Sequence, residues 1–447
     1  MSHEQLNEAL KSVAHGNARA RLEKLFDNGT IIEFDKFLTD NGEPCGVVTA
    51  GGYVSGMRVY AFSQDASVRS GGMTVMQARK IKRIYEMAAK TGAPVVGIYD
   101  SKGAVITEGV KVLSAYSELI GLSNRISGVV PQISLVLGVC SGVSAVLANT
   151  ADVLVMSEDA QMYVTPANVA ADKNVGTAKL SAENGTAAVV RATEDEAIES
   201  AKELLAYIPA NNLSLPAVAD YVPAVGGDVL ESVVDDGSLF ELYKDYADCA
   251  SVGFARIGGM SVGVVATKGK KLCGNGALKI VRFVRLCDAY SIPLVTLLDC
   301  EGILGSDESE VYGDVKSISL LTQSYSEATN VKVTLIAGKA YASVFAAFAG
   351  NSGNADMVFA LEDAEIGVLP PETAVQFAEL DKIGDKSREE LEAEYAASCS
   401  ALSAAAEGFV DDVITKDEAA AKIISALETL SSKRVSTLDK KHTVLPL

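Results

Sequence analysis

The chain repeats itself at long range, and this repeat limits the folds that it can adopt. Residues 80–103 align without a gap on residues 279–302 at a constant offset of 199, and seven of the 24 positions are identical. Two further pairs of segments follow in the same order: residues 26–34 with 234–242, and residues 151–164 with 355–368. Ordered matches at similar offsets indicate that each half of the chain repeats one fold.

The length of the chain agrees with a duplication. A single hydrophobic core rarely grows much beyond about 250–300 residues, so a chain of 447 residues is expected to form two domains. We place the boundary in the segment 213–232, which carries Pro and Gly-Gly. The predicted domains are residues 1–222 and 223–447.

Each half shows an α/β pattern. An amphipathic helix is followed by Pro and a short apolar run, at residues 95–99 in the first half and 294–298 in the second. A second helix and a second apolar run follow, at residues 133–137 and 333–337, and each run ends in a turn of small residues. Helices that alternate with buried strands predict a mostly parallel sheet in each half.

Composition narrows the function and the location. The formal net charge of −19 argues against nucleic acid or an anionic membrane as the main partner, because a phosphate backbone needs a basic surface. Residues 126–151 contain no charged side chain, but Pro131 and Gln132 interrupt the segment, which predicts a buried strand and helix. The first 25 residues resemble an amphipathic helix rather than a signal peptide, so we expect a cytoplasmic protein.

Segments spread along the chain carry a family pattern. They are ARARLEKLFDNGT (18–30), AFSQDASVRSGG (61–72), TGAPVVGIYDSKGAVITEGV (91–110), GVVPQISLVLGVCSG (128–142), SVGFARIGGMSVGVVA (251–266), VRFVRLCDAYSIPLVTLLDCEGIL (281–304) and KKHTVLPL (440–447). This pattern resembles the acyl-CoA carboxyltransferases, which include the propionyl-CoA carboxylase beta subunit and the alpha subunits of methylmalonyl-CoA and glutaconyl-CoA decarboxylases. The resemblance implies two tandem crotonase-type (ClpP/crotonase) β-β-α superhelix domains, with the acyl-CoA side in the first and the biotin side in the second.

The resemblance also implies two oxyanion holes made of backbone N–H groups. One would stabilise the enolate of the acyl-CoA thioester, and the other would stabilise the ureido oxygen of biotin. The implied donors are Gly142 and Val143 in the first half and Ser343 and Val344 in the second. The implied substrate-binding positions are Lys102, Gly103, Ala104, Gly302, Ile303 and Ala346.

The chain departs from the family at several of these positions. A Gly-Gly pair of the family corresponds to Gly142-Val143, a Gly-Gly-Ala segment corresponds to residues 342–344, and Ala346 replaces an Asp. Backbone donors persist with any side chain, whereas the width of the pocket does not. Two interpretations therefore stay open: an enzyme with an altered acyl preference, or a non-catalytic scaffold paralogue in a carboxylase or decarboxylase complex.

Cys140 suggests a third hypothesis. GVCSG at residues 138–142 resembles a nucleophile elbow, which would suit a CoA-thioester hydrolase. A cysteine nucleophile needs a base or a lowered pKa, and the three histidines, His3, His15 and His442, lie near the termini. We therefore interpret Cys140 as a small packed residue.

The expected cofactor is biotin on a separate carrier protein, because no methionine is followed by lysine and the Met-Lys-Met biotinylation signature is missing. No metal is expected, since the acidic residues lack the close spacing of an oxygen-ligand site. The resemblance implies a biotin carrier and either a biotin carboxylase or membrane sodium-pump decarboxylase subunits as partners. It also implies a homo-oligomer, from dimer to hexamer, that reaches the membrane only through such partners.

Overall fold

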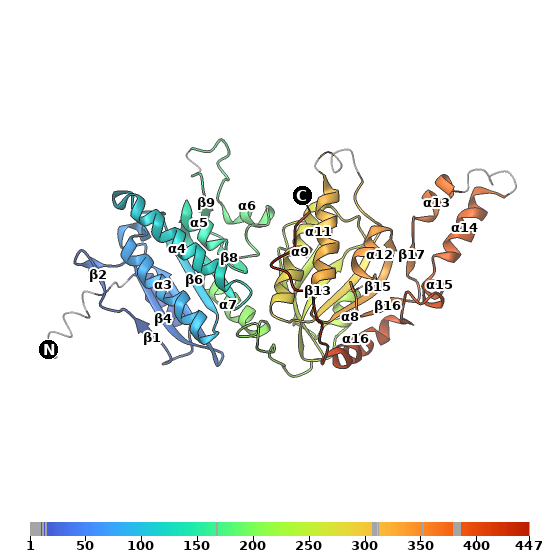
Figure 1. The fold of residues 1–447 in the computed structure, drawn as a ribbon, viewed down its shortest axis with the longest axis horizontal. Helices are drawn as coiled ribbons and strands as arrows, with labels where there is room; N and C mark the ends of the chain where they lie inside the picture. The colour runs from blue at the N-terminus through green and yellow to red at the C-terminus, as the bar shows by residue number, and fades with distance from the viewer. Residues whose placement is uncertain are drawn as a thin grey trace. The chain divides into compact units, whose positions relative to one another are not determined.

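The computed structural model describes residues 10, 13, 16–166, 169–305, 311, 313–350, 353–378 and 386–446. The chain divides into two compact units, Met1–Leu215 and Pro216–Leu447. Each unit is built around one eight-stranded sheet covered by helices (Figure 1).

The sheet of the N-terminal unit has the order β1-β4-β5-β6-β7-β8-β10, and β9 pairs with the end of β7. Strands β1, β4 and β5 are antiparallel, and every later pairing is parallel. The strands are β1 (Ile32–Phe34), β4 (Val47–Val54), β5 (Met57–Gln64), β6 (Val95–Ser101), β7 (Gln132–Ser141), β8 (Val153–Ser157), β9 (Gln161–Tyr163) and β10 (Val189–Arg191), with a separate ribbon of β2 (Thr39–Asp40) and β3 (Glu43–Pro44).

Helices cover both faces of this sheet. They are α2 (Asn17–Leu25), α3 (Val75–Thr91), α4 (Val110–Ile126), α5 (Val143–Ala148), α6 (Ala178–Glu183) and α7 (Glu194–Tyr207), with short 3₁₀ turns at Arg69–Gly71 and Ile106–Glu108. Neighbouring side chains of a strand point to opposite faces. Tyr99 of β6 belongs to the buried cluster beneath α3, α4 and α5, whereas the adjacent Asp100 bonds to Arg21 of α2. Helices α2 and α7, which pack on each other, therefore cover the other face.

The C-terminal unit repeats this arrangement in the order β11-β12-β13-β14-β15-β16-β18, with β17 beside β15. Its strands are β11 (Phe240–Leu242), β12 (Ala250–Ile257), β13 (Met260–Thr267), β14 (Leu294–Cys300), β15 (Lys332–Tyr341), β16 (Met357–Leu361), β17 (Glu365–Gly367) and β18 (Asp412–Ile414). Its helices are α8 (Val229–Val233), α9 (Gly274–Ala289), α11 (Asp314–Glu327), α12 (Ser343–Phe348), α13 (Pro371–Ala378), α14 (Arg388–Ser398), α15 (Ala401–Ala406) and α16 (Lys416–Leu430). Helices α13 and α14 pack on each other and project from the body of this unit (Figure 1).

The two sheets share their irregularities as well as their strand order, which confirms the internal duplication. The pairing of β6 with β7 shifts register between Tyr99 and Ser101, and the pairing of β14 with β15 shifts between Leu298 and Cys300. An isolated bridge follows each shift, Met73 with Ala104 and Leu272 with Ile303. Equivalent bulges and bridges place the loop after β6 and the loop after β14 in the same local geometry.

Two local features bear on the sequence predictions. Residues 126–151 form the end of α4, strand β7 and helix α5, as predicted, and none of the described helices is both long and apolar enough to span a bilayer. The second apolar run of each half was predicted to end at residue 137 or 337, but the strand that it forms is longer. Strands β7 and β15 continue to Ser141 and Tyr341 because β9 and β17 pair with their last residues.

Candidate active site

The N-terminal site lies where β7 turns into α5. Gly142 occupies this turn with φ +61° and ψ −129°, a conformation that favours glycine. Its N–H donates to the carbonyl of Tyr163 in β9 at 2.9 Å. The first free donors of the helix are therefore the N–H groups of Val143 and Ser144, which have no acceptor within the described residues.

The loop after β6 contributes a further unoccupied donor. The N–H of Gly103 donates to Ser101 Oγ at 3.1 Å, and the N–H of Val105 donates to the Met73 carbonyl at 2.9 Å. Between them, the N–H of Ala104 has no acceptor among the described residues.

The two strand ends of this site are in contact. Ser101 pairs in register with Cys140, and a Cβ atom on Gly103 would lie 3.2 Å from the Ser141 carbonyl oxygen. Gly103 also has φ +95°, so a side chain here would be strained as well as crowded. The structure thus brings Gly103 and Ala104 next to the start of α5.

The C-terminal site has the same construction. Ala342 precedes α12 with φ +53° and ψ −128°, and its N–H donates to the Gly367 carbonyl in β17 at 3.0 Å. In the loop after β14, the N–H of Leu304 donates to the Leu272 carbonyl at 2.9 Å. The N–H groups of Ile303 and Ser343 are left without an acceptor in the part of the chain that the structure describes.

The two sites differ in the residue at the turn. A Cβ atom on Gly142 would meet open space, and the cost of a side chain there would be conformational. Ala342 already carries a side chain in this conformation, which costs on the order of 1 kcal/mol or more for a residue other than glycine. The C-terminal turn therefore has nearly the same backbone conformation as the N-terminal turn, but it is strained because its residue is alanine.

Comparison with known proteins identifies the family. The family model described as "Carboxyl transferase domain" matches residues 14–445. The chain belongs to the carboxyl transferase family. Its relatives include the propionyl-CoA carboxylase carboxyltransferase subunit of Haloferax mediterranei, which is 33% identical over 480 residues that cover 96% of this chain and 93% of the relative.

Two further relatives support the same assignment. The methylmalonyl-CoA decarboxylase alpha subunit of Veillonella parvula is 34% identical over 477 residues, with 96% of this chain and 93% of the relative covered. The solved structure of transcarboxylase 12S, a hexamer with methylmalonyl-CoA bound, matches with a TM-score of 0.94 and 32% identity over 99% of this chain and 98% of that chain. The predicted family and crotonase-type fold are confirmed.

An ionic network supports the N-terminal site of this carboxyltransferase. The Arg21 guanidinium, 5% exposed, donates to both carboxylate oxygens of Glu194 at 2.9 and 2.6 Å and to Asp100 at 3.0 Å. Burial alone would lower the pKa of Arg21, but Glu194 and Asp100 outweigh it and the pKa is raised. Asp100 in turn accepts from the N–H of Val139, so the network connects α2 and α7 to the last residues of β7.

The C-terminal site of the carboxyltransferase adjoins a cavity of about 540 Å³. The cavity is lined by both charged and apolar residues: Lys271, Glu301, Lys339, Tyr341, Glu365, Pro370, Pro371, Glu372, Glu392, Ala393 and Ala396. Lys339 and Glu301 form an ion pair of 2.9 Å, which lowers the pKa of Glu301. Because Glu301 precedes Gly302 and Tyr341 precedes Ala342, the cavity opens beside both loops of this site.

The other predicted site residues lie at the edges of the two sites. The Lys102 side chain is exposed, and its N–H donates to the Ser70 carbonyl. Ala346 is exposed one turn into α12, whereas Val344 is buried. Tyr163 and Gly367, which orient the two turns, were not predicted, although they are paired by the repeat of 151–164 with 355–368.

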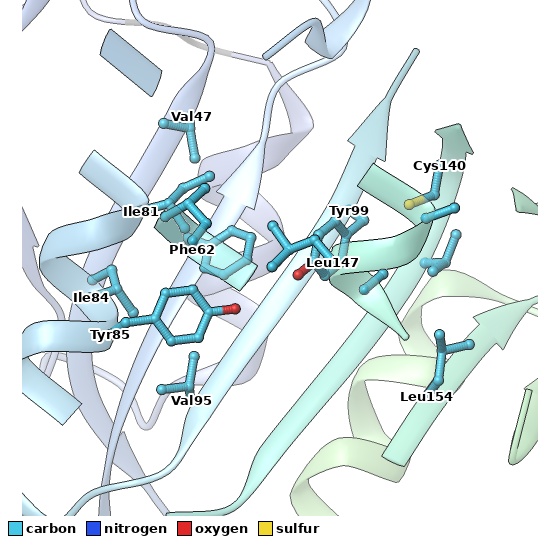
Figure 2. Close-up of a cluster of buried hydrophobic side chains, with 14 of the residues drawn as sticks. Val47, Phe62, Ile81, Ile84, Tyr85, Val95, Tyr99, Cys140, Leu147 and Leu154 are labelled. Atoms are coloured by element: carbon cyan, nitrogen blue, oxygen red, sulfur yellow. The ribbon is translucent and has the colours of Figure 1, made fainter. Parts of the chain in front are cut away.

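Cys140 lies in the core of the carboxyltransferase rather than in its site. Figure 2 shows it in the buried cluster that includes Tyr99 and Leu147, and it is 0% exposed. Burial raises the pKa of its thiol well above the ordinary range. His3 and His15 lie outside the described residues, and His442 is exposed near the C-terminus. Cys140 is therefore a packed thiol without access to a substrate.

Proposed function

We propose that this carboxyltransferase moves a carboxyl group between a short-chain acyl-CoA, of the propionyl-CoA and methylmalonyl-CoA type, and biotin held on a separate carrier protein. The relatives support the acyl group, because they are a propionyl-CoA carboxylase subunit and a methylmalonyl-CoA decarboxylase subunit. The similar transcarboxylase 12S structure contains methylmalonyl-CoA. The same chemistry runs toward carboxylation with a biotin carboxylase partner and toward decarboxylation with a membrane sodium pump.

One observation carries this proposal. In each half, unoccupied backbone N–H groups follow neighbouring strand ends, in the loop after the first strand and at the start of the helix that follows the second. Preorganised donors of this kind stabilise charge that develops on an oxygen atom in the transition state. We assign Ala104 and Val143 to the thioester oxygen, and Ile303 and Ser343 to the ureido oxygen of biotin.

The assignment accounts for the reaction without a side-chain nucleophile. When the bond between the α-carbon and the carboxyl group breaks, its electron pair moves onto the thioester oxygen, where Ala104 and Val143 would bind the enolate. The carboxyl carbon forms a bond to the biotin nitrogen, and the proton of that nitrogen passes to the α-carbon. In the reverse direction, the bond between the biotin nitrogen and the carboxyl carbon breaks and its electron pair moves onto the ureido oxygen, which Ile303 and Ser343 would stabilise. The nitrogen then takes the proton that the α-carbon loses.

The two halves would thus bind different substrates: residues 1–222 would bind the acyl-CoA, and residues 223–447 would bind biotin. The cavity of about 540 Å³ beside Glu301 and Tyr341 has a volume typical of small-molecule sites, which supports a biotin site there. We further propose a homo-oligomer, since the similar transcarboxylase 12S is a hexamer. Its active sites would combine the first half of one protomer with the second half of another.

Proline substitution tests the backbone donors directly. Val143 and Ser343 are the first residues of α5 and α12, a position where proline is well tolerated and where it removes the N–H group without breaking a hydrogen bond within the helix. Val143→Pro and Ser343→Pro should each lower kcat for carboxyl transfer from methylmalonyl-CoA to free biotin by about 10² to 10³.

The matched controls are Val143→Ala and Ser343→Ala, which keep the N–H groups and should stay within about tenfold of the unmodified protein. Unfolding midpoints confirm that each variant is folded. Proline variants that are as active as their alanine controls would contradict the assignment. An unmodified protein that neither turns over nor binds methylmalonyl-CoA, malonyl-CoA or glutaconyl-CoA would favour the scaffold alternative.

A further inference from the structure

Two thiols lie side by side at the start of α9. Cys273 Sγ is 3.4 Å from Cys249 Sγ. Cys249 is buried immediately before β12, whereas Cys273 is partly exposed. The remaining five cysteines are all buried, so Cys273 is the thiol that a soluble reagent reaches most easily.

The backbone around the pair makes room for both sulfur atoms. Cys273 is the N-cap of α9, and its sulfur accepts from the N–H of Gly276 at 3.4 Å. A Cβ atom on Gly276 would lie 2.4 Å from Cys249 Sγ, closer than real atoms approach. Glycine at position 276 is therefore a condition for the thiols to meet.

The N-terminal half lacks this arrangement at the equivalent place. Thr74 caps α3 there, with its hydroxyl accepting from the N–H of Gln77 at 3.1 Å. The buried Gln77 side chain fills the space and donates to the Gly46 carbonyl at 2.9 Å. Threonine is a common N-cap residue, and cysteine is not. The need for an N-cap therefore does not explain why residue 273 is a cysteine.

The environment gives the two sulfur atoms different roles. The pKa of Cys273 is lowered to about 6, because Cys249 donates a hydrogen bond to it and the N–H groups of Gly276 and Asn275 favour the thiolate. The same contact, together with burial, raises the pKa of Cys249. The accessible sulfur is thus the nucleophilic thiolate, and the buried sulfur keeps its proton.

We propose that Cys249 and Cys273 form a dithiol that hydrogen peroxide converts reversibly into a disulfide. The Cys273 thiolate attacks one peroxide oxygen, the O–O bond breaks, and sulfenic acid and, after protonation, water form. Cys249 then attacks the Cys273 sulfur, the S–O bond breaks, and the departing hydroxide takes the Cys249 proton to form a second water. Two thiols lose two electrons, and one peroxide is reduced to two waters.

The disulfide would act on the C-terminal site. The sulfur atoms must approach from 3.4 Å to about 2 Å, which displaces the cap of α9. Leu272, next to Cys273, donates its N–H to the Gly302 carbonyl and accepts from the N–H of Leu304, both at 2.9 Å. Movement of Leu272 therefore shifts the loop that carries the Ile303 donor, and this regulatory step rests on the proposed function.

Thiol mapping tests the dithiol without reference to activity. Peroxide-treated protein should yield a peptide pair linked through Cys249 and Cys273, and dithiothreitol should release it. Cys249→Ser should instead accumulate a sulfenic acid at Cys273 that dimedone traps. Cys273→Thr, which restores the N-cap of the first half, should give no link. Reaction of Cys273 no faster than that of the buried Cys399 would overturn the proposal.

Activity tests the coupling separately. Peroxide should lower carboxyl transfer by the unmodified protein at least about fivefold, reversibly, and should leave Cys273→Thr unchanged. An equal loss in Cys273→Thr would show that the disulfide does not control the site. If the reduced protein transfers no carboxyl group at all, the proposed function fails, while the thiol map still decides the chemistry of the pair.

Discussion

The two halves of the molecule share a backbone arrangement but differ in the residues at the two turns. Gly142 and Ala342 have nearly the same φ and ψ, and each is fixed by one hydrogen bond to a short strand, through the carbonyls of Tyr163 and Gly367. Glycine is therefore not needed to set the position of the donors that follow. The difference teaches that main-chain pairing maintains the donor geometry, while the side chain at the turn decides strain and space.

The halves also differ in what lies behind each site. Asp100 is held by the buried Arg21, which links it to Glu194. Its counterpart Asp299 accepts from the N–H of Lys339 at 2.9 Å, and no ion pair to Asp299 occurs among the described residues. The first half thus rests on buried charge, and the second half relies on backbone hydrogen bonds for the same carboxylate.

Removal of Arg21 should give the largest effect on stability. Arg21→Met leaves the carboxylate of Asp100 without its cation, and the loss of one partner from a buried pair costs about 3 kcal/mol or more. Urea unfolding should show this loss. Arg19→Met is the control, because Arg19 pairs with Glu33 at a more exposed position and should cost less than about 1 kcal/mol. Equal losses would contradict the role of burial.

Exchange of the turn residues should give smaller effects of opposite sign. Ala342→Gly removes a side chain from a strained conformation and should stabilise the protein by up to about 1 kcal/mol. Gly142→Ala introduces the same strain and should destabilise it by a similar amount. Thermal unfolding of the two single variants measures both changes. Two changes of the same sign would show that the turns are not equivalent.

The fold and the donor positions Val143 and Ser343 could be predicted from the sequence, whereas the occupied N–H group of Gly142 could not. The repeat of residues 80–103 with 279–302 is a local signal of a helix and a strand, and it reproduces α3 with β6 and α9 with β14. Gly142 was a predicted donor, but its N–H is occupied by Tyr163, which returns to β7 through a three-residue strand. Such pairing depends on where a loop folds back onto the strand. The periodic pattern of apolar residues in the sequence does not indicate that position.

The charged side chains beside the two sites should give the smallest effects. Lys102 and Glu301 occupy the same repeat position with opposite charge, and Glu301 offsets the cation of Lys339. Lys102→Gln should lower kcat/KM for the anionic methylmalonyl-CoA, whereas Glu301→Gln should raise kcat/KM for carboxybiotin. Each change should be less than about fivefold, since both side chains are partly or fully exposed, and each should shrink as salt screens the field. Initial rates at low and high ionic strength measure both effects, and changes of the same sign would mean that the two sites do not select by charge.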